Sequence, residues 1–208
     1  MINIDFDVKK IKNLVFDVGG ILLGYRWEDM FKDHGTDREK ALRIGRGLFD
    51  SPDWTLYDSG IISTKELIDR FCLKYPDLEE EARWFLNNAI LMRVPRDKVY
   101  EELKILKDKG YKIYLLSNYS QELFELHTSD LPFRKLTDGE LVSYMVKTVK
   151  PKREIYEILR DRFSLNPEES VFFDDREDNV KGAIACGFNG VYIKDQSEEL
   201  LLEYLRQF

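Results

Sequence analysis

Polar residues that could bind a charged ligand stand directly after short apolar runs in three distant parts of the chain. Asp17 follows one run, Ser117 and Asn118 follow a second, and Asp174 and Asp175 follow a third. In an open α/β sheet, ligands bind at the carboxyl ends of the strands. If the three runs are strands of one parallel sheet, these side chains meet at one edge of it.

Three carboxylates that meet at one place need a compensating cation. Two carboxylates about 4 Å apart repel each other by about 4 kcal/mol at an effective dielectric constant near 20. Lys150 supplies one positive charge against Asp17, Asp174 and Asp175. A hard divalent ion with oxygen ligands fits this cluster best, and Mg²⁺ is the usual one. An acidic pocket that holds Mg²⁺ beside a lysine and a serine hydroxyl suits a phosphate group.

Each of these residues, taken alone, has an ordinary structural explanation. A single aspartate after a strand is commonly a turn former. The pair Asp174 and Asp175, followed by Arg176, is typical of a solvated turn, and a lone lysine generally lies on the surface. Function is therefore indicated by the ordered set at the predicted strand ends and not by any one member.

The elements that must position these residues predict an α/β fold. Runs rich in valine, phenylalanine and tyrosine predict buried parallel strands at 14–16, 113–116, 171–173 and 191–193. Apolar residues at helical spacing predict helices between them and in the tail that begins at Ser197. Strands that alternate with helices predict a Rossmann-like parallel sheet flanked by helices.

One long interval interrupts this alternation. From about Gly24 to Val94 there is no strong strand signal, and Ser63 to Glu66 form a capping box that predicts the start of a helix. About seventy residues are too many for an ordinary crossover connection. We therefore expect a core domain at 1–23 and 95–208, with a small helical cap at 24–94 inserted after the first strand.

Four motifs resemble those of the haloacid dehalogenase-like (HAD) superfamily. They are Phe16 to Leu22 (FDVGGIL), Leu116 to Asn118, Lys150-Pro151 with Ile155-Tyr156, and Phe173 to Asp175 continuing to Asn179. The resemblance covers about residues 12–195 in the right order, and the helical insert is similar to that family's small cap. The chain looks most similar to the branch that contains glucose-1-phosphate phosphatases and the phosphatase domain of soluble epoxide hydrolases.

This resemblance implies a role for each matched residue. Asp17 is the expected nucleophile, which attacks phosphorus and forms an aspartyl-phosphate. Ser117 and Asn118 are expected to bind the phosphoryl oxygens, and Lys150 to neutralise charge on the phosphoryl group and the nucleophile. Asp175 is the expected direct ligand of Mg²⁺, with Asp174 as a ligand through water or an orienting partner.

The first motif departs from the pattern of most phosphatases in the superfamily. These have an aspartate two residues after the nucleophile, and this chain has Gly19 there. Glycine still supplies the main-chain carbonyl that ligates the metal in the family, but it lacks the acid that protonates the leaving group, which typically contributes 10²–10⁴-fold. We expect a slow or leaving-group-selective phosphatase, in which Gly19→Asp raises the rate with poor leaving groups.

Substrate specificity is expected to come from the cap. Candidates for binding a sugar or a second phosphate are Tyr25, Arg26 and Trp27, which follow the nucleophile loop closely, and Trp54, which precedes a turn. The alternative for the tryptophans is that they pack the cap against the core. His34 and His127 match no nucleophile or metal pattern and are expected at the surface.

Composition excludes several classes of protein. The chain has 208 residues and a net charge of −7, which argues against a nucleic-acid binder or an anionic-membrane binder. Met1 to Asp7 lack the pattern of a secretory signal, and no apolar run reaches the length of a membrane span. We expect a cytoplasmic protein, monomeric or weakly homodimeric, that acts on a small phosphorylated metabolite.

Three functional hypotheses follow. The leading one is a Mg²⁺-dependent phosphatase of small metabolites such as sugar phosphates. The second is a metal-independent 2-haloacid dehalogenase, in which Asp17 attacks carbon; the acidic pair at 174–175 argues against it. The third is a catalytically weak module that binds a phosphorylated ligand and regulates, which the absence of an acid at Gly19 keeps open.

Overall fold

The computed structural model describes residues 5–208; Met1 to Ile4, which open the segment considered above for a secretory signal, lie outside the described residues. The centre of the fold is a five-stranded sheet in the order β5-β4-β1-β6-β7, with every neighbouring pair parallel. Its strands are β1 (Asn13–Phe16), β4 (Lys112–Ser117), β5 (Gly139–Val142), β6 (Ser170–Asp174) and β7 (Asn189–Tyr192). The predicted α/β fold with a parallel sheet is confirmed.

Alternate residues of the central strands point to opposite faces of the sheet, because side chains in a strand alternate in direction. Leu14 and Phe16 of β1 pack in one hydrophobic cluster with Val99 and Leu103. Val15, between them, packs in a second cluster with residues that include Ile155. The sheet is therefore covered on both faces, which explains why its strands appear in the sequence as continuous apolar runs.

Six helices of the core lie between β3 (Arg93–Pro95) and the end of the described chain, most of them between consecutive strands. They are α6 (Asp97–Asp108), α7 (Gln121–Thr128), α8 (Ser143–Val146), α9 (Arg153–Phe163), α10 (Glu177–Ala185) and α11 (Glu198–Leu205). The first cluster contains residues of α6, α7 and α11, and the second contains residues of α9 and α10. The helices predicted between the strands are present, and the predicted terminal helix begins after its N-cap Ser197.

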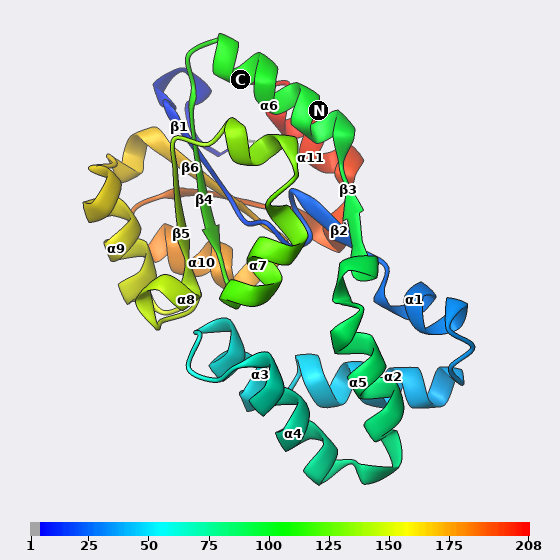
Figure 1. The fold of residues 1–208 in the computed structure, drawn as a ribbon. Coiled ribbons are helices and arrows are strands. Elements are labelled where there is room, and N and C mark those ends of the chain that lie inside the picture. Colours follow the sequence, from blue (N-terminus) through cyan, green and yellow to red (C-terminus); the bar gives the residue numbers. More distant parts are fainter. Residues whose placement is uncertain (1–4) are drawn as a thin grey trace.

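The insert after β1 is helical, as expected. It comprises α1 (Trp27–Asp33), α2 (Arg38–Phe49), α3 (Pro52–Asp58), α4 (Thr64–Lys74) and α5 (Glu79–Asn87). Ser63 and Glu66 form the predicted capping box at the start of α4. Figure 1 shows these helices beyond the end of the sheet toward which the β4 arrow points, so the insert covers the carboxyl ends of the strands.

The chain enters and leaves the insert through a two-stranded antiparallel ribbon of β2 (Leu23–Tyr25) and β3 (Arg93–Pro95). The expected limits of the cap, Gly24 and Val94, are paired residues of this ribbon. We propose the ribbon as the boundary between cap and core.

Three strands were not predicted. β2, β3 and β5 have three or four residues each, too few to show a period-two pattern. β5 lies at the edge of the sheet, and its Gly139 and Glu140 are only partly buried. Short 3₁₀ turns complete the fold: η1 (Val8–Lys10), η2 (Pro76–Leu78), η3 (Ala89–Met92), η4 (Pro132–Lys135), η5 (Pro167–Glu169) and η6 (Lys194–Gln196).

The expectation that both histidines lie at the surface is half wrong. His34 is exposed and stacks on Trp84, whereas His127 is fully buried. His127 is tolerated in the interior because its two ring nitrogens contact the Tyr119 hydroxyl and the Ala89 carbonyl. Within residues 5–208, no helix is long and apolar enough to cross a bilayer.

Candidate active site

Asp17 lies directly beyond β1, with its N–H bonded to the carbonyl of Phe173 at 2.9 Å in the neighbouring strand β6. Its side chain is buried and fixed by donors. Oδ1 accepts hydrogen bonds from the Ser117 hydroxyl at 2.6 Å and from the Val18 N–H at 2.7 Å. The predicted meeting of strand ends therefore occurs, and it places Ser117 against Asp17 across 100 residues of sequence.

Lys150 lies between two of the carboxylates. Its Nζ is 3.0 Å from Asp17 and 2.7 Å from Asp174, and the side chain is fully buried. Burial alone lowers the pKa of Lys150, but the two carboxylates outweigh it and raise the pKa above its ordinary value. Lys150 is therefore a fixed cation at the centre of the site.

Asn118 positions Lys150 in this structure. Its Oδ1 accepts from the Lys150 N–H at 2.8 Å, and its Nδ2 donates to the Lys150 carbonyl at 3.0 Å. The side-chain amide is thus occupied by the main chain of Lys150. Direct binding of phosphoryl oxygens by Asn118 stays a prediction.

The two acidic residues after β6 have different surroundings. Asp174 is fully buried and accepts from Lys150, from the Arg176 N–H at 2.8 Å and from the Asn179 amide at 3.0 Å. Asp175 is partly exposed, and its Oδ2 accepts from Gln196 at 2.8 Å. Asp174 is therefore saturated with donors, whereas Asp175 has more capacity to bind a cation.

The carboxylates of Asp17, Asp174 and Asp175 each place one oxygen within 4.8 Å of the others. Burial, together with the charges of Asp174 and Asp175, raises the pKa of Asp17, against the lowering effect of Lys150. The donor set consists of hard oxygen atoms with an excess of negative charge. It fits Mg²⁺, and the main-chain carbonyl of Gly19 remains a predicted ligand.

Gly20 is required by the backbone and by the site together. It has a φ of +73°, and a Cβ there would lie 2.4 Å from Asp175 Oδ2. Only glycine adopts this conformation without strain and leaves room for the carboxylate. The second glycine of the first motif therefore brings the nucleophile loop close to the metal-site carboxylates.

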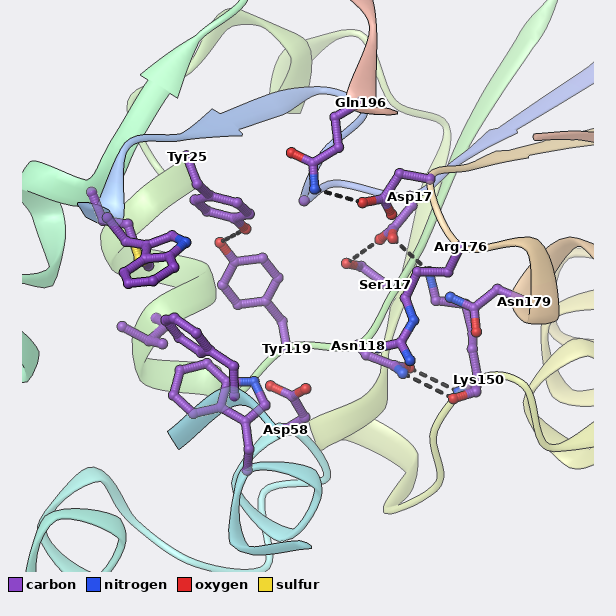
Figure 2. A pocket seen from close by; sticks show the side chains of 17 residues that line it. Asp17, Tyr25, Asp58, Ser117, Asn118, Tyr119, Lys150, Arg176, Asn179 and Gln196 are labelled. Carbon is purple, nitrogen blue, oxygen red and sulfur yellow. Dashed lines mark hydrogen bonds and ion pairs between the residues drawn. The ribbon is translucent and has the colours of Figure 1, made fainter. Parts of the chain in front are cut away.

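A cavity of about 350 Å³ opens above Asp17 and is lined by both core and cap. Figure 2 shows its two sides: polar groups around Asp17, and aromatic rings opposite them. The apolar part of the lining comes mainly from Tyr25, Trp27, Phe49, Trp54, Met92 and Leu123. This volume is within the usual range for a small-molecule pocket.

The cap residues predicted to bind substrate behave differently from one another. Trp27 and Trp54 line the cavity and also pack edge to face against Phe49 of the cap helix α2. That they bind substrate stays a prediction. Arg26 is outside the lining and pairs with Asp33 at the two ends of α1. Its expected role in binding substrate is not supported, because its charge is already paired away from the cavity.

The position beside Gly19 is occupied by another side chain. A Cβ at Gly19 would lie 2.7 Å from the hydroxyl of Tyr25. That hydroxyl is held 2.5 Å from the hydroxyl of Tyr119. An aspartate at position 19 would have to displace Tyr25, so the expected gain of activity in Gly19→Asp is not supported.

Three further polar residues line the cavity and were not predicted from the sequence to act there: Asp58, Arg176 and Gln196. In the sequence, Asp58 is followed by Ser59 and Gly60, a pattern typical of a turn. The local sequence does not indicate that Asp58 lies in the cavity, because the position of α3 depends on contacts with the distant segment 143–147 of the core. Ser143 of α8 donates to the Asp58 carbonyl at 2.5 Å, and Lys147 donates to the Gly60 carbonyl at 2.7 Å.

Comparison with known proteins gives a family match over most of the chain. Residues 11–187 match the sequence model of the haloacid dehalogenase-like hydrolases. A sesquiterpene phosphatase of Aspergillus oryzae is 25% identical over 190 residues, which are 88% of this chain and 90% of that protein. An (S)-2-haloacid dehalogenase of Burkholderia cepacia is 32% identical over 96 residues, 46% of this chain and 42% of that protein.

The fold is also found among solved structures. A HAD family enzyme of Bacteroides thetaiotaomicron, solved in complex with magnesium and inorganic phosphate, superimposes with a TM-score of 0.71. It is 23% identical and covers 90% of this chain and 96% of its own. At this level of identity the likeness establishes the shared fold.

Proposed function

Because the chain belongs to the haloacid dehalogenase-like hydrolases, we propose that it is a Mg²⁺-dependent phosphatase of small phosphorylated metabolites. The observation that carries this proposal is the setting of Asp17. Its carboxylate contacts the Ser117 hydroxyl and the Lys150 ammonium within 3.0 Å. A nucleophile flanked by a hydroxyl and a fixed cation is suited to a dianionic phosphate ester.

Bond formation begins at Asp17. One carboxylate oxygen attacks phosphorus in line with the leaving oxygen, so the Asp17–phosphorus bond forms while the ester bond breaks. Ser117 donates a hydrogen bond to a phosphoryl oxygen, and Lys150 balances the charge of the phosphoryl group and of the nucleophile. Lys150 is already fixed beside Asp17 and stabilises the transition state without reorganisation, whereas the Ser117 hydroxyl turns from Asp17 to the phosphoryl oxygen.

Asp17, Asp175 and the carbonyl of Gly19 would hold Mg²⁺, with Asp174 orienting the site or bound through water. When bound, Mg²⁺ would supply positive charge that stabilises the phosphoryl group. The hydrogen bonds from Arg176, Asn179 and Lys150 keep Asp174 in place. In the second step, water attacks phosphorus, phosphate leaves and the carboxylate of Asp17 is regenerated.

The organic part of the substrate would occupy the aromatic side of the cavity. Trp27 and Trp54 offer flat apolar faces there, which suit the face of a sugar ring or a hydrocarbon group. We therefore propose a phosphate ester with such a group, bound between cap and core. We also propose that, within the family, the chain belongs to the branch that contains glucose-1-phosphate phosphatases and the phosphatase domain of soluble epoxide hydrolases.

Dehalogenation is the second candidate, since part of the chain resembles a 2-haloacid dehalogenase. It needs Asp17 but no metal. The two extra carboxylates of Asp174 and Asp175, close to Asp17, argue for a cation site and hence for the phosphatase.

The test is phosphate release from a panel of sugar phosphates, prenyl phosphates, nucleotides and p-nitrophenyl phosphate, with Mg²⁺ and with chelator. We expect release that requires Mg²⁺, and a loss of at least about 1,000-fold in Asp17→Asn, because the covalent route is removed. Asp5→Asn, at an exposed position near the start of the chain, is the control. Chloride release from 2-chloropropionate without metal would favour the dehalogenase. Release of neither phosphate nor chloride would favour a binding module.

A further inference from the structure

We propose that Asp58, contributed by the cap, is the proton donor to the leaving group, in place of the acid that Gly19 lacks. This role rests on the proposed phosphatase function. It follows from the geometry of three side chains at the boundary of cap and core: Tyr25, Tyr119 and Asp58.

The space that an acid at position 19 would use is filled by Tyr25, as described above. The hydroxyl of Tyr25 is therefore the group nearest to that position. It carries a proton, so its hydrogen-bond direction decides whether it can act as the acid.

That direction is set by His127, at the far end of a hydrogen-bonded row. Nε2 of His127 lies 2.9 Å from the Ala89 carbonyl, which only accepts, so Nε2 carries the proton. Burial lowers the pKa of His127 to about 4, which keeps the ring neutral and makes Nδ1 an acceptor. Tyr119 must then donate to His127, and Tyr25 must donate to Tyr119. Tyr25 faces the cavity as an acceptor and has no proton to give.

Asp58 lies at the end of α3, on the cap side of the same cavity. Figure 2 shows its carboxyl directed into the cavity, well apart from Asp17 in this view. Among residues 5–208, no side-chain or main-chain donor is hydrogen-bonded to this carboxyl. An in-line displacement places the leaving oxygen opposite the attacking oxygen of Asp17, and hence toward the cap.

The charges around Asp58 leave it able to carry a proton. Burial raises the pKa of Asp58 to about 7, against the lowering effects of Lys150 and Arg176. The phenols of Tyr25, Tyr57 and Tyr119 also face it, and burial raises the pKa of each, so they are neutral. A donor is most effective when its pKa is near the working pH.

The proton balance closes over the two steps. As the ester bond breaks, the Asp58 proton moves to the leaving oxygen and an alcohol departs, leaving Asp58 as a carboxylate. In the second step, Asp58 accepts a proton from the water that attacks the phosphoryl group on Asp17. Phosphate is released, and Asp58 returns to its protonated form.

The test compares Asp58→Asn with the wild type on two esters of similar size. Benzyl phosphate has an alkoxide leaving group that needs a proton, whereas p-nitrophenyl phosphate has a stabilised one that does not. We expect a loss of about 100-fold or more in kcat with benzyl phosphate, and a loss at least tenfold smaller with p-nitrophenyl phosphate. Asp53→Asn, on the same helix but paired with Arg70 outside the cavity, is the matched control and should match the wild type.

The pH profile gives a second readout. With benzyl phosphate, the wild-type rate should fall as the pH rises through about 7, because Asp58 then loses its proton; this limb should be absent in Asp58→Asn. Asp58→Glu, which keeps a carboxyl, should recover part of the benzyl phosphate activity and serves if Asp58→Asn fails to fold.

Equal losses on both esters, or no loss on benzyl phosphate, would overturn the role of Asp58 while leaving the phosphatase intact. If neither ester gives phosphate release that depends on Asp17, the phosphatase itself fails and the role of Asp58 falls with it.

Discussion

Gly20 shows how strongly a single residue can constrain this site. A Cβ at this position would meet Asp175 Oδ2 at 2.4 Å, and its φ of +73° is strained for any other residue. Gly20→Ala should therefore displace Asp175, raise the Mg²⁺ concentration needed for half-maximal rate, and lower kcat by about tenfold or more. Gly35→Ala is the matched control: φ is +81°, but nothing lies within 4 Å of a Cβ there.

Both variants should lose about 1–2 kcal/mol of stability from the positive φ. Only Gly20→Ala should change the Mg²⁺ dependence, as measured by titrating Mg²⁺ in the phosphatase assay. An identical Mg²⁺ dependence in the two variants would show that Asp175 is not held by the space beside Gly20.

At the scale of the element, two cap helices begin at serine N-caps, but only one of them lines the cavity. Ser51 caps α3, which bears Trp54 and Asp58, and Ser63 caps α4, which does not line the cavity. Ser51→Ala and Ser63→Ala should each cost about 1 kcal/mol in urea unfolding, because each removes an acceptor from a helix terminus. Only Ser51→Ala should raise KM, by a few fold, since it loosens the helix that lines the cavity. A rise in KM of the same size in Ser63→Ala would contradict this assignment.

At the scale of the whole molecule, cap and core share one hydrophobic cluster. It runs from Leu14 and Leu115 of the sheet to Leu48 and Phe85 of the cap. A continuous core predicts a single cooperative unfolding transition in calorimetry. Mg²⁺ with orthovanadate, a phosphate analogue, at 100 times its Kd should stabilise the fold by about 2.7 kcal/mol and raise Tm by roughly 5–10 °C. Two resolved transitions, with only one shifted by the ligand, would show that the cap unfolds independently.

The sequence by itself determined the parts of this protein that depend on local pattern. Buried parallel strands are continuous apolar runs, so β1, β4 and β6 and the residues at their ends could be identified. Because those ends meet at one edge of a parallel sheet, Asp17, Ser117 and the Asp174-Asp175 pair could be predicted to converge. The role of Lys150 was predicted from its motif. The helical cap followed from the long interval without strands.

Only the tertiary structure decided what surrounds that centre. The short strands β2, β3 and β5 are formed by pairing with neighbours, and glycine, proline or charged residues interrupt any apolar run in them. Arg26 is paired with Asp33, Tyr25 fills the space beside Gly19, and Asp58 reaches the cavity because α3 packs on α8. The physical reason is that these placements depend on contacts between cap and core, which join segments far apart in the chain and leave no signal in the order of neighbouring residues.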